Sequence, residues 1–288
     1  MASNLTFIVS GGRTGTKFLG DLLSKKIADC YSEHEPDLFL GFDRISIERI
    51  RRFGLWHMVF GRALGMTGVR VTGTQFMTGK KDLDKTINAL RRQRLAYHSS
   101  IEQSLVLESY YAWWMVAPHL PKIFPGSKTI GVIRDPRHWI ASWLARDARR
   151  SNGHWTHMLP PGPINPHTVG DSHWAKEWDT WTPVIKLAWQ WMTINRQIEI
   201  AMERSNLTLL RFEDIFDPQK QALNALAIAA TDFPSSDYEI GDLHSLISEK
   251  RNASDAKADS WQRWTDHERA MTNTLCGPLM SRFGYDAL

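Results

Sequence analysis

The sequence predicts an α/β fold with three layers, in which helices cover both faces of a central parallel sheet. Short apolar runs alternate with helical patterns along the chain, and this alternation is typical of parallel sheets. Of the 288 residues, 42% are hydrophobic and 23% are charged, which predicts a globular core. No internal repeat or long low-complexity linker interrupts the chain, and we expect residues 1–288 to form a single domain.

Four apolar runs have the length and composition of buried strands. They are residues 5–10, 105–108, 128–133 and 207–211. The first run ends in Gly11-Gly12 and the third ends at Arg134-Asp135-Pro136, so each passes directly into a turn and then a helical pattern.

Helical patterns fill most of the intervals between these runs. We expect helices at residues 16–27, 112–124, 138–149, 175–204, 217–230 and 266–282. Pro136 suits the start of a helix, and Pro183 is expected to break the longest one. Less regular segments are residues 33–68, the proline-rich residues 154–173, interpreted as a surface loop or lid, and residues 249–260.

Composition limits the function classes. The net charge of +4 suits an anionic ligand but is too small to indicate a nucleic-acid partner. Cys30 and Cys276 do not suggest a disulfide framework, and no Cys/His cluster has zinc spacing, so no metal is expected. The first apolar run is too short for a signal peptide or a membrane span. We therefore expect a soluble, cytoplasmic protein, and nothing in the sequence indicates an oligomeric state.

The most informative segment joins the first strand to the first helix and reads Gly11-Gly-Arg-Thr-Gly-Thr-Lys-Phe18. Exposed backbone N–H groups and the positive end of a helix dipole meet at such a junction, so the segment suits a phosphate. An ordinary glycine turn between strand and helix is the alternative.

This loop departs from the ATP-binding pattern G-x-x-x-x-G-K-[ST]. Gly11 and Gly15 are one residue too close together, and Lys17 is followed by Phe18, which cannot hold a metal ion. A phosphate-bearing ligand without a metal therefore fits better than Mg-ATP.

A second basic segment follows the third strand. Arg134 leaves the end of that strand, and Ser142 follows after a spacing of eight residues, two helical turns later. Arg134 can fork onto a phosphate, and Ser142 can donate a further hydrogen bond. Alternatively, Arg134 pairs with Asp135 or a neighbouring carboxylate, and Ser142 only packs.

The order of these segments resembles the sulfotransferase family, which uses 3′-phosphoadenosine 5′-phosphosulfate (PAPS). Residues 12–16 resemble the family's 5′-phosphosulfate loop, and Arg134-Asp135-Pro136 with Ser142 resembles its 3′-phosphate motif. Residues 209–218 are similar to the family's strand ending in "YEDL…DP", with Phe212 in place of the tyrosine. The resemblance implies a P-loop NTPase-like sulfotransferase fold and the donor PAPS, without a metal.

The resemblance also implies roles for individual residues. Arg13 would neutralise the leaving group, Arg134 and Ser142 would bind the 3′-phosphate, and Arg251 would add a further contact there. The backbone N–H groups that would hold the 5′-phosphate belong to Thr14, Gly15, Thr16, Lys17 and Phe18. The Lys17 side chain either adds phosphate affinity or points to solvent.

A base must take the proton of the acceptor. Residues 30–36 follow the first helix and are expected to lie at the end of the next short strand. Carbohydrate and tyrosyl-protein sulfotransferases often place a glutamate in this region, so the resemblance implies Glu35 as the base. His34 is the second candidate, because its ordinary pKa suits proton transfer. Alternatively, Glu33 and Glu35 are solvated carboxylates of a loop.

Glu108, at the end of the second apolar run, is a further candidate base, and a structural pair with an arginine is its alternative. Cytosolic aryl sulfotransferases carry a histidine near that point, whereas this chain has Glu108-Ser-Tyr-Tyr111. The chain is therefore closer to the carbohydrate and tyrosyl-protein sulfotransferases.

Eight of the thirteen tryptophans fall between Trp139 and Trp191, either as a packed face or as an aromatic acceptor cleft in which Trp155 would touch the acceptor. The sequence as a whole predicts sulfonate transfer from PAPS to a hydroxyl or amine of a glycan or small-molecule acceptor. A P-loop small-molecule kinase and an inactive nucleotide-binding protein of the same fold are the alternatives.

Overall fold

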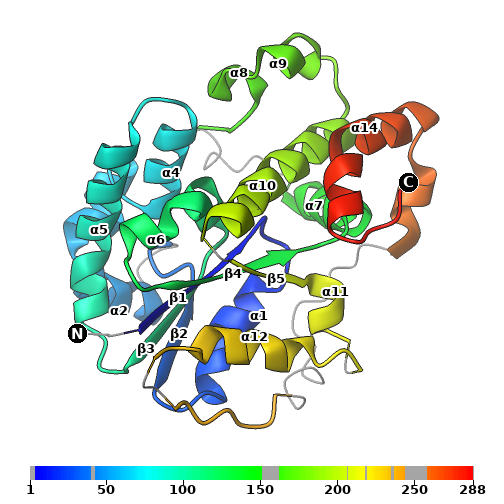
Figure 1. Ribbon diagram of the computed structural model, residues 1–288. Coiled ribbons are helices and arrows are strands. Elements are labelled where there is room, and N and C mark those ends of the chain that lie inside the picture. Colours follow the sequence, from blue (N-terminus) through cyan, green and yellow to red (C-terminus); the bar gives the residue numbers. More distant parts are fainter. Residues whose placement is uncertain are drawn as a thin grey trace.

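Five parallel strands form the centre of the molecule. The computed structural model describes residues 4–39, 43–150, 162–205, 207–217, 219–234, 237–243 and 258–287. Its strands form one sheet in the order β2-β3-β1-β4-β5, and all neighbouring strands run parallel (Figure 1). The predicted α/β class with a central parallel sheet is therefore confirmed.

The strands agree closely with the expected apolar runs. They are β1 (Asn4–Ser10), β2 (Cys30–His34), β3 (Leu105–Ser109), β4 (Lys128–Ile133) and β5 (Thr208–Arg211). β2 is the short strand expected before Glu35, and it forms one edge of the described sheet.

Helices connect the strands and cover the sheet. The α-helices are α1 (Thr16–Leu22), α2 (Arg44–Phe53), α3 (Gly61–Ala63), α4 (Val69–Met77), α5 (Leu83–Ser99), α6 (Leu120–Ile123), α7 (Pro136–Arg150), α8 (Pro166–Val169), α9 (Ser172–Trp178), α10 (Pro183–Ser205), α11 (Phe212–Ile215), α12 (Ala222–Thr231) and α14 (Asp266–Arg282). The described residues also form the 3₁₀ segments η1 (Leu23–Lys25), η3 (Tyr111–His119) and η5 (Ala258–Arg263) and the π-helical segment η2 (Trp56–Phe60).

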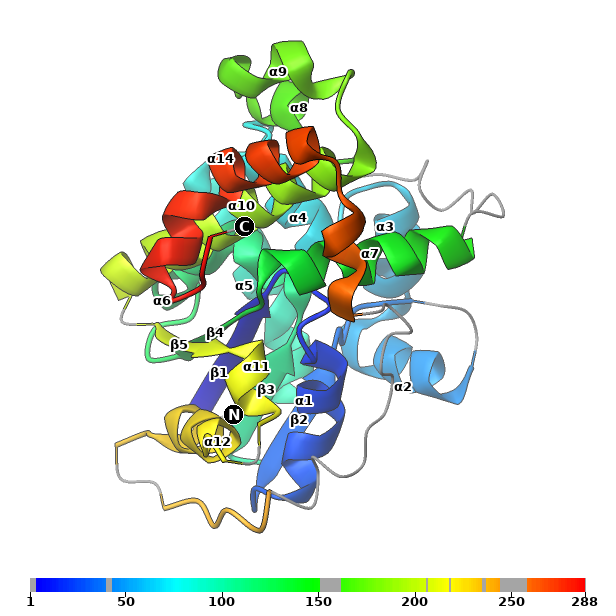
Figure 2. The same ribbon diagram turned by 90° about the vertical axis from the view of Figure 1, so that its right-hand side faces the viewer.

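Alternate residues of β1 point into two different cores. Phe7 and Val9 join a core with η3, α10 and α14, whereas Ile8 joins a core with α1 and α12. Figures 1 and 2 show α1 and α12 together on one side of the sheet and α10 with α14 on the other. This period of two explains why three successive residues of β1, Phe7 to Val9, are apolar and buried.

Several predicted helices differ in detail. Residues 112–124 form a 3₁₀ segment followed by the short helix α6, and Pro118 lies inside the 3₁₀ segment, where it supplies no backbone N–H. The break expected at Pro183 within residues 175–204 is confirmed, because α9 ends at Trp178 and Pro183 opens α10. The helix expected from residue 217 begins at Ala222. The irregular residues 33–68 contain α2, η2 and α3.

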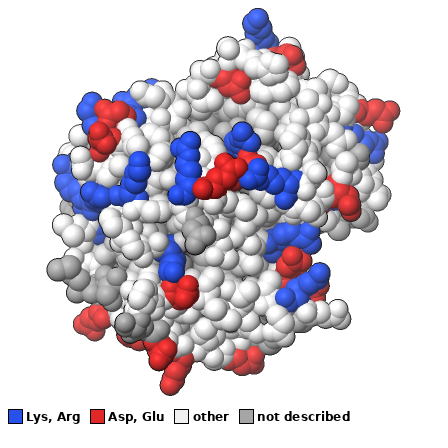
Figure 3. All heavy atoms as spheres, viewed as in Figure 1, with Lys and Arg blue, Asp and Glu red and all other residues white. Residues whose placement is uncertain are grey.

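The charged side chains do not form one continuous surface patch of a single sign. On the face drawn in Figure 3, Lys and Arg side chains lie among Asp and Glu side chains, which agrees with a net charge of only +4. Of the helices among the described residues, none has the length and apolar character that a membrane span requires.

Candidate functional site

The candidate site lies where the parallel strands end. β1 has β3 on one side and β4 on the other, so the chain leaves β1 at the point where the strand order reverses. In open α/β sheets, ligands bind outside the carboxyl ends of the strands at such a point. The loop that resembles a phosphate-binding segment follows β1 at this position.

This loop has backbone angles that residues with side chains rarely adopt. Gly12, Arg13 and Gly15 have φ angles of 70°, 56° and 74°. A Cβ atom at Gly15 would also lie 2.8 Å from two ring carbons of Phe216. Glycine at residue 15 is therefore required both by the backbone angle and by the close approach of an aromatic ring.

The path leaves several hydrogen-bond donors without acceptors. Among the described residues, no hydrogen-bond acceptor pairs with the backbone N–H groups of the loop, which belong to Thr14, Gly15, Thr16, Lys17 and Phe18. The Thr14 hydroxyl is buried and likewise has no partner there. Successive N–H groups in a curved segment form a concave anion site, so the loop has the donors that a phosphate requires.

The two predicted phosphate-binding segments meet at Arg13. Its Nε donates to the hydroxyl oxygen of Ser142 at 3.0 Å, and Nη1 of Arg134 donates to its backbone carbonyl at 2.8 Å. Ser142 is fully buried. In this arrangement the buried Ser142 positions the Arg13 side chain.

Arg134 has an unused donor. Its Nε is buried and has no hydrogen-bond partner among the described residues, and its guanidinium carbon lies 4.4 Å from the centre of the Phe212 ring. Burial lowers the pKa of Arg134. An anion beside Nε would supply the missing acceptor, which is the role expected for Arg134.

Two indole N–H groups fix the backbone of both segments. Trp139 Nε1 donates to the carbonyl of Gly12 at 2.9 Å, and Trp191 Nε1 donates to the carbonyl of Arg134 at 2.8 Å. Both side chains are buried, so these two tryptophans belong to the packed face and not to an open cleft. Trp155 lies outside the described residues.

The remaining residues of the predicted nucleotide site differ in position. Lys17 is exposed on α1, whereas Phe18 packs on Phe216 with ring centres 5.0 Å apart. Arg251 lies outside the described residues. Among the residues that are described, no group of three or more His, Cys, Asp and Glu side chains could hold a metal ion.

Glu35 directly follows β2 in a largely buried setting. Its side chain is 14% exposed, and burial, reinforced by repulsion from Asp37, raises its pKa to about 7. The Nδ1 atom of His34 lies 3.0 Å from the carbonyl of Ser109, so Nδ1 carries the hydrogen, and Nε2 lies 3.7 Å from Oε1 of Glu35. Burial lowers the pKa of His34 to about 4, which leaves the imidazole neutral at pH 7. Glu35 therefore exchanges its proton near pH 7, as suits a general base.

Arg49 of α2 holds the turn that contains Glu35. Its Nε donates to Oε1 of Glu33 at 2.8 Å, and its other nitrogens donate to the carbonyls of Leu38 at 2.8 Å and His34 at 3.0 Å. Glu35 has a φ of 48°, which a residue other than glycine keeps only where its surroundings impose it. Glu33 is thus an ion-pair partner, and neither it nor Glu35 is a solvated loop carboxylate.

Ser109, at the end of β3, connects this turn to the loop. Its hydroxyl donates to the carbonyl of Thr16 at 2.8 Å. Its carbonyl accepts from His34 Nδ1 and, at 3.2 Å, from the backbone N–H of Glu35. Sequence reasoning missed both Ser109 and Arg49. The only available signal was the place of Ser109 directly after the second expected strand, residues 105–108.

Close packing also brings the turn toward the loop. A Cβ atom at Gly20 of α1 would lie 2.7 Å from the backbone nitrogen of His34, so α1 rests directly on the end of β2. Tyr111 lies within 3.6 Å of the Cβ position at Gly12. Burial raises the pKa of Tyr111, and the charge of Glu35 raises it further, so Glu35 and the loop both lie near this ring.

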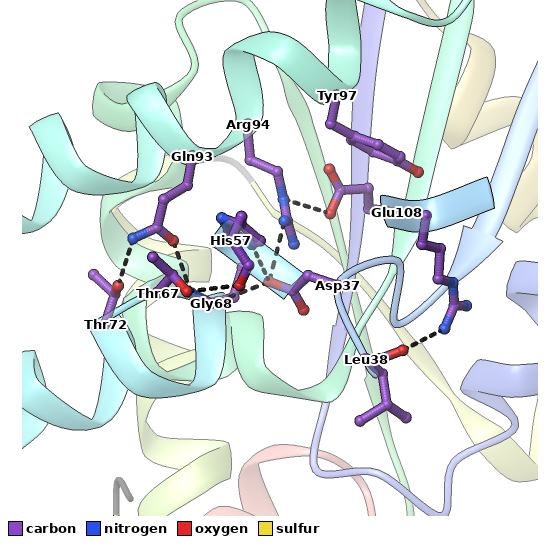
Figure 4. A network of polar contacts seen from close by, with 12 residues as sticks. Asp37, Leu38, His57, Thr67, Gly68, Thr72, Gln93, Arg94, Tyr97 and Glu108 are labelled. Carbon is purple, nitrogen blue, oxygen red and sulfur yellow. Dashed lines mark hydrogen bonds and ion pairs between the residues drawn. The ribbon is translucent and has the colours of Figure 1, made fainter. Parts of the chain in front are cut away.

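Glu108 belongs to a buried network and not to the open part of the site. Its carboxylate lies 3.2 Å from Nε of Arg94 (Figure 4). It also lies 2.7 Å from Nε2 of His98. Arg94 also lies 3.1 Å from Asp37, and although burial opposes it, Arg94 holds the pKa of Asp37 well below its usual range. Glu108 therefore has the alternative role, a structural pair with an arginine, and we do not retain it among the acid–base groups.

Comparison with known proteins adds likenesses of fold only. Neither a family model nor a curated protein matches the sequence. Over 98% of its length the chain is similar to a sulfotransferase domain from the curacin biosynthetic pathway, with 16% identity, a TM-score of 0.44 and 98% of that chain covered. It is also similar over 98% of its length to a sulfotransferase domain from the Synechococcus PCC 7002 olefin synthase, with 17% identity, a TM-score of 0.46 and 95% of that chain covered. Because both TM-scores are below 0.5, the α/β classification rests on the strand order and register of this chain itself.

Proposed function

We propose that this chain is a single-domain sulfotransferase with a P-loop-like fold, which transfers a sulfonate group from PAPS to a hydroxyl or amine of a carbohydrate or small metabolite. The observation that carries the proposal is the meeting of both predicted phosphate-binding segments at Arg13, through its contacts with Ser142 and Arg134. The unpartnered donors of the loop and of Arg134 fit a nucleotide with phosphates at its 5′ and 3′ ends.

Bound PAPS would supply a sulfonate group whose bond to the 5′-phosphate breaks as the acceptor oxygen or nitrogen attacks sulfur. Glu35 takes the proton that the acceptor loses, and its raised pKa suits this task at neutral pH. Arg13 and the loop N–H groups neutralise the charge that develops on the departing phosphate. Arg49 fixes the turn and so keeps the Glu35 carboxylate in place.

The donor can be tested separately from the acceptor. Calorimetric titration with the product 3′-phosphoadenosine 5′-phosphate (PAP) and with ADP should give an affinity at least about tenfold higher for PAP. Arg134→Ala should remove this preference, whereas Arg92→Ala, at an exposed position of α5, should keep it. Equal affinity of the wild type for PAP and ADP would exclude the role given to Arg134.

Turnover is then measured with PAPS and a panel of sugar, phenol and metabolite acceptors, with and without EDTA. The sulfonated product should form in both conditions, because the proposed chemistry uses only side-chain and backbone donors. Metal-dependent consumption of ATP would favour the kinase. PAP binding without turnover of any acceptor would favour a nucleotide-binding protein that lacks the chemistry.

A further inference from the structure

The exposed apolar side chains are concentrated in one short part of the chain. Of the nine large apolar side chains that are exposed among the described residues, seven lie between residues 45 and 66. The other two are Leu95 on α5 and Ile228 on α12. Single exposed apolar residues are ordinary, but such a concentration marks an interaction surface.

The segment that contains η2 and α3 turns an apolar face outward. Trp56, Phe60 and Leu64 are 55%, 53% and 64% exposed, whereas His57 and Met58 are buried. The rings of Trp56 and Phe60 lie 6.4 Å apart, and the N–H of Leu64 donates to the carbonyl of Phe60 at 3.0 Å. A surface helix usually turns its polar face to water, so this orientation is reversed.

We call Leu55, Trp56, Phe60, Leu64 and Met66 together the 55–66 surface; all of them are exposed. Its sequence neighbourhood is strongly basic, because residues 43–70 contain six arginines and only two carboxylates. Arg44, Arg51 and Arg70 are exposed, and of these three Arg51 is already paired with Glu48. Both carboxylates are on or beside α2, and Glu48 is paired with Arg51 and Arg52 at 3.5 and 3.3 Å. Figure 2 shows α2 and α3 on the same side of the molecule.

We propose that the 55–66 surface docks on a bilayer that contains anionic lipids. Trp, Phe and Leu side chains insert at the boundary between headgroups and acyl chains, and nearby arginines meet negative headgroups. This charge complementarity selects a lipid surface over an apolar protein partner. Arg62, inside the same helical run, donates to the carbonyl of Asp37, so docking would bring the Glu35 turn close to the bilayer.

Vesicle flotation tests the proposal without any use of PAPS or turnover. Wild-type protein is mixed at low salt with vesicles of phosphatidylcholine and phosphatidylglycerol, or of phosphatidylcholine alone. The double variant W56S/F60S should lose at least about tenfold in binding to the anionic vesicles, because two large apolar side chains no longer insert. The matched control is L95S/I228S, which removes two exposed apolar side chains from α5 and α12 and should bind as the wild type.

Circular dichroism of both double variants confirms that they are folded, and high salt should weaken wild-type binding. Failure of the wild type to float with anionic vesicles would overturn the proposal, and so would equal binding of wild type and W56S/F60S. If the wild type bound phosphatidylcholine vesicles as well as the anionic ones, the proposed requirement for anionic lipids would be excluded. A wild-type dimer that W56S/F60S converts to a monomer would assign the surface to a second copy of the chain instead.

Discussion

Arg13 and Ser142 are 129 residues apart in the sequence, yet Nε of Arg13 donates to the hydroxyl oxygen of Ser142 at 3.0 Å. The contact joins the loop after β1 to helix α7 after β4. Because Ser142 is fully buried, it gives the guanidinium of Arg13 a fixed place beside the unpartnered N–H groups of the loop.

Replacing Ser142 with alanine should weaken PAP binding. The variant S142A leaves the Arg13 Nε without its acceptor, and a hydrogen bond to a charged group contributes about 1.5–3 kcal/mol, so the affinity should fall about 10- to 100-fold. Calorimetric titration measures this. Ser172→Ala, in the exposed first turn of α9, serves as the control. An unchanged affinity in S142A would show that the contact does not organise the loop.

Gly15→Ala should damage both stability and PAP binding. Gly126 also has a positive φ, of 81°, but no atom lies within 4 Å of its Cβ position, so G126A measures the cost of the backbone angle alone. We expect G126A to lose about 1 kcal/mol in the free energy of unfolding. G15A should lose clearly more, because the new Cβ also overlaps the Phe216 ring. Urea unfolding compares the two, and equal losses would contradict the steric account.

Glu35→Gln should abolish proton acceptance while leaving the nucleotide site intact. We expect kcat to fall about 10²- to 10⁴-fold with an unchanged affinity for PAP. Because the base acts when deprotonated and burial raises its pKa to about 7, wild-type kcat/KM should rise with pH through about 7 and then level off. Glu102→Gln, at an exposed position, is the control. A wild-type profile that is flat between about pH 5 and 8 would remove Glu35 from this role.

Arg49→Lys should lower kcat without changing PAP affinity. Lysine keeps the charge but cannot reach Glu33, His34 and Leu38 together as the guanidinium fork does. The pH dependence of kcat/KM separates the positioning effect of Arg49 from the effect of its charge on the Glu35 pKa. R49K should keep the midpoint near 7, whereas R49Q should move it to higher pH, because Arg49 lowers the Glu35 pKa. Arg51→Lys, on the exposed side of the same helix, should behave as the wild type. Equal midpoints in R49K and R49Q would contradict this assignment.

Arg94→Met should be among the most destabilising single substitutions in the chain. Arg94 is fully buried and lies between the carboxylates of Asp37 and Glu108, so its removal takes the arginine partner from two buried charges. Loss of one partner of a buried ion pair costs about 3–5 kcal/mol. Chemical denaturation measures the loss, and Arg92→Met, exposed on the same helix, is the control. Similar stabilities of R94M and R92M would show that the network contributes little.

The elements that sequence reasoning placed correctly are those with a simple apolar pattern. β1, β3, β4 and β5 are short apolar runs, and their positions differ from the expected ones by at most one residue at either end. The segment 55–64 was not recognised as helical, because its exposed side is apolar and the usual alternation of buried apolar and exposed polar residues is absent. Residues 112–124 were expected as an α-helix, but Pro118 removes a backbone donor and a 3₁₀ segment forms instead.

The sequence by itself determined the α/β class and the glycine-containing loop after β1, and it singled out Arg13, Arg134 and Ser142 as candidates for a phosphate site, because strand periodicity and loop composition are local properties. Only the tertiary structure decided that Arg13 rests on Ser142, that Glu108 is neutralised by Arg94, and that Arg49 holds the turn of Glu35. The physical reason is that pairing, burial and raised or lowered pKa values depend on which distant segments pack together, and the strand order 2-3-1-4-5 sets those neighbours.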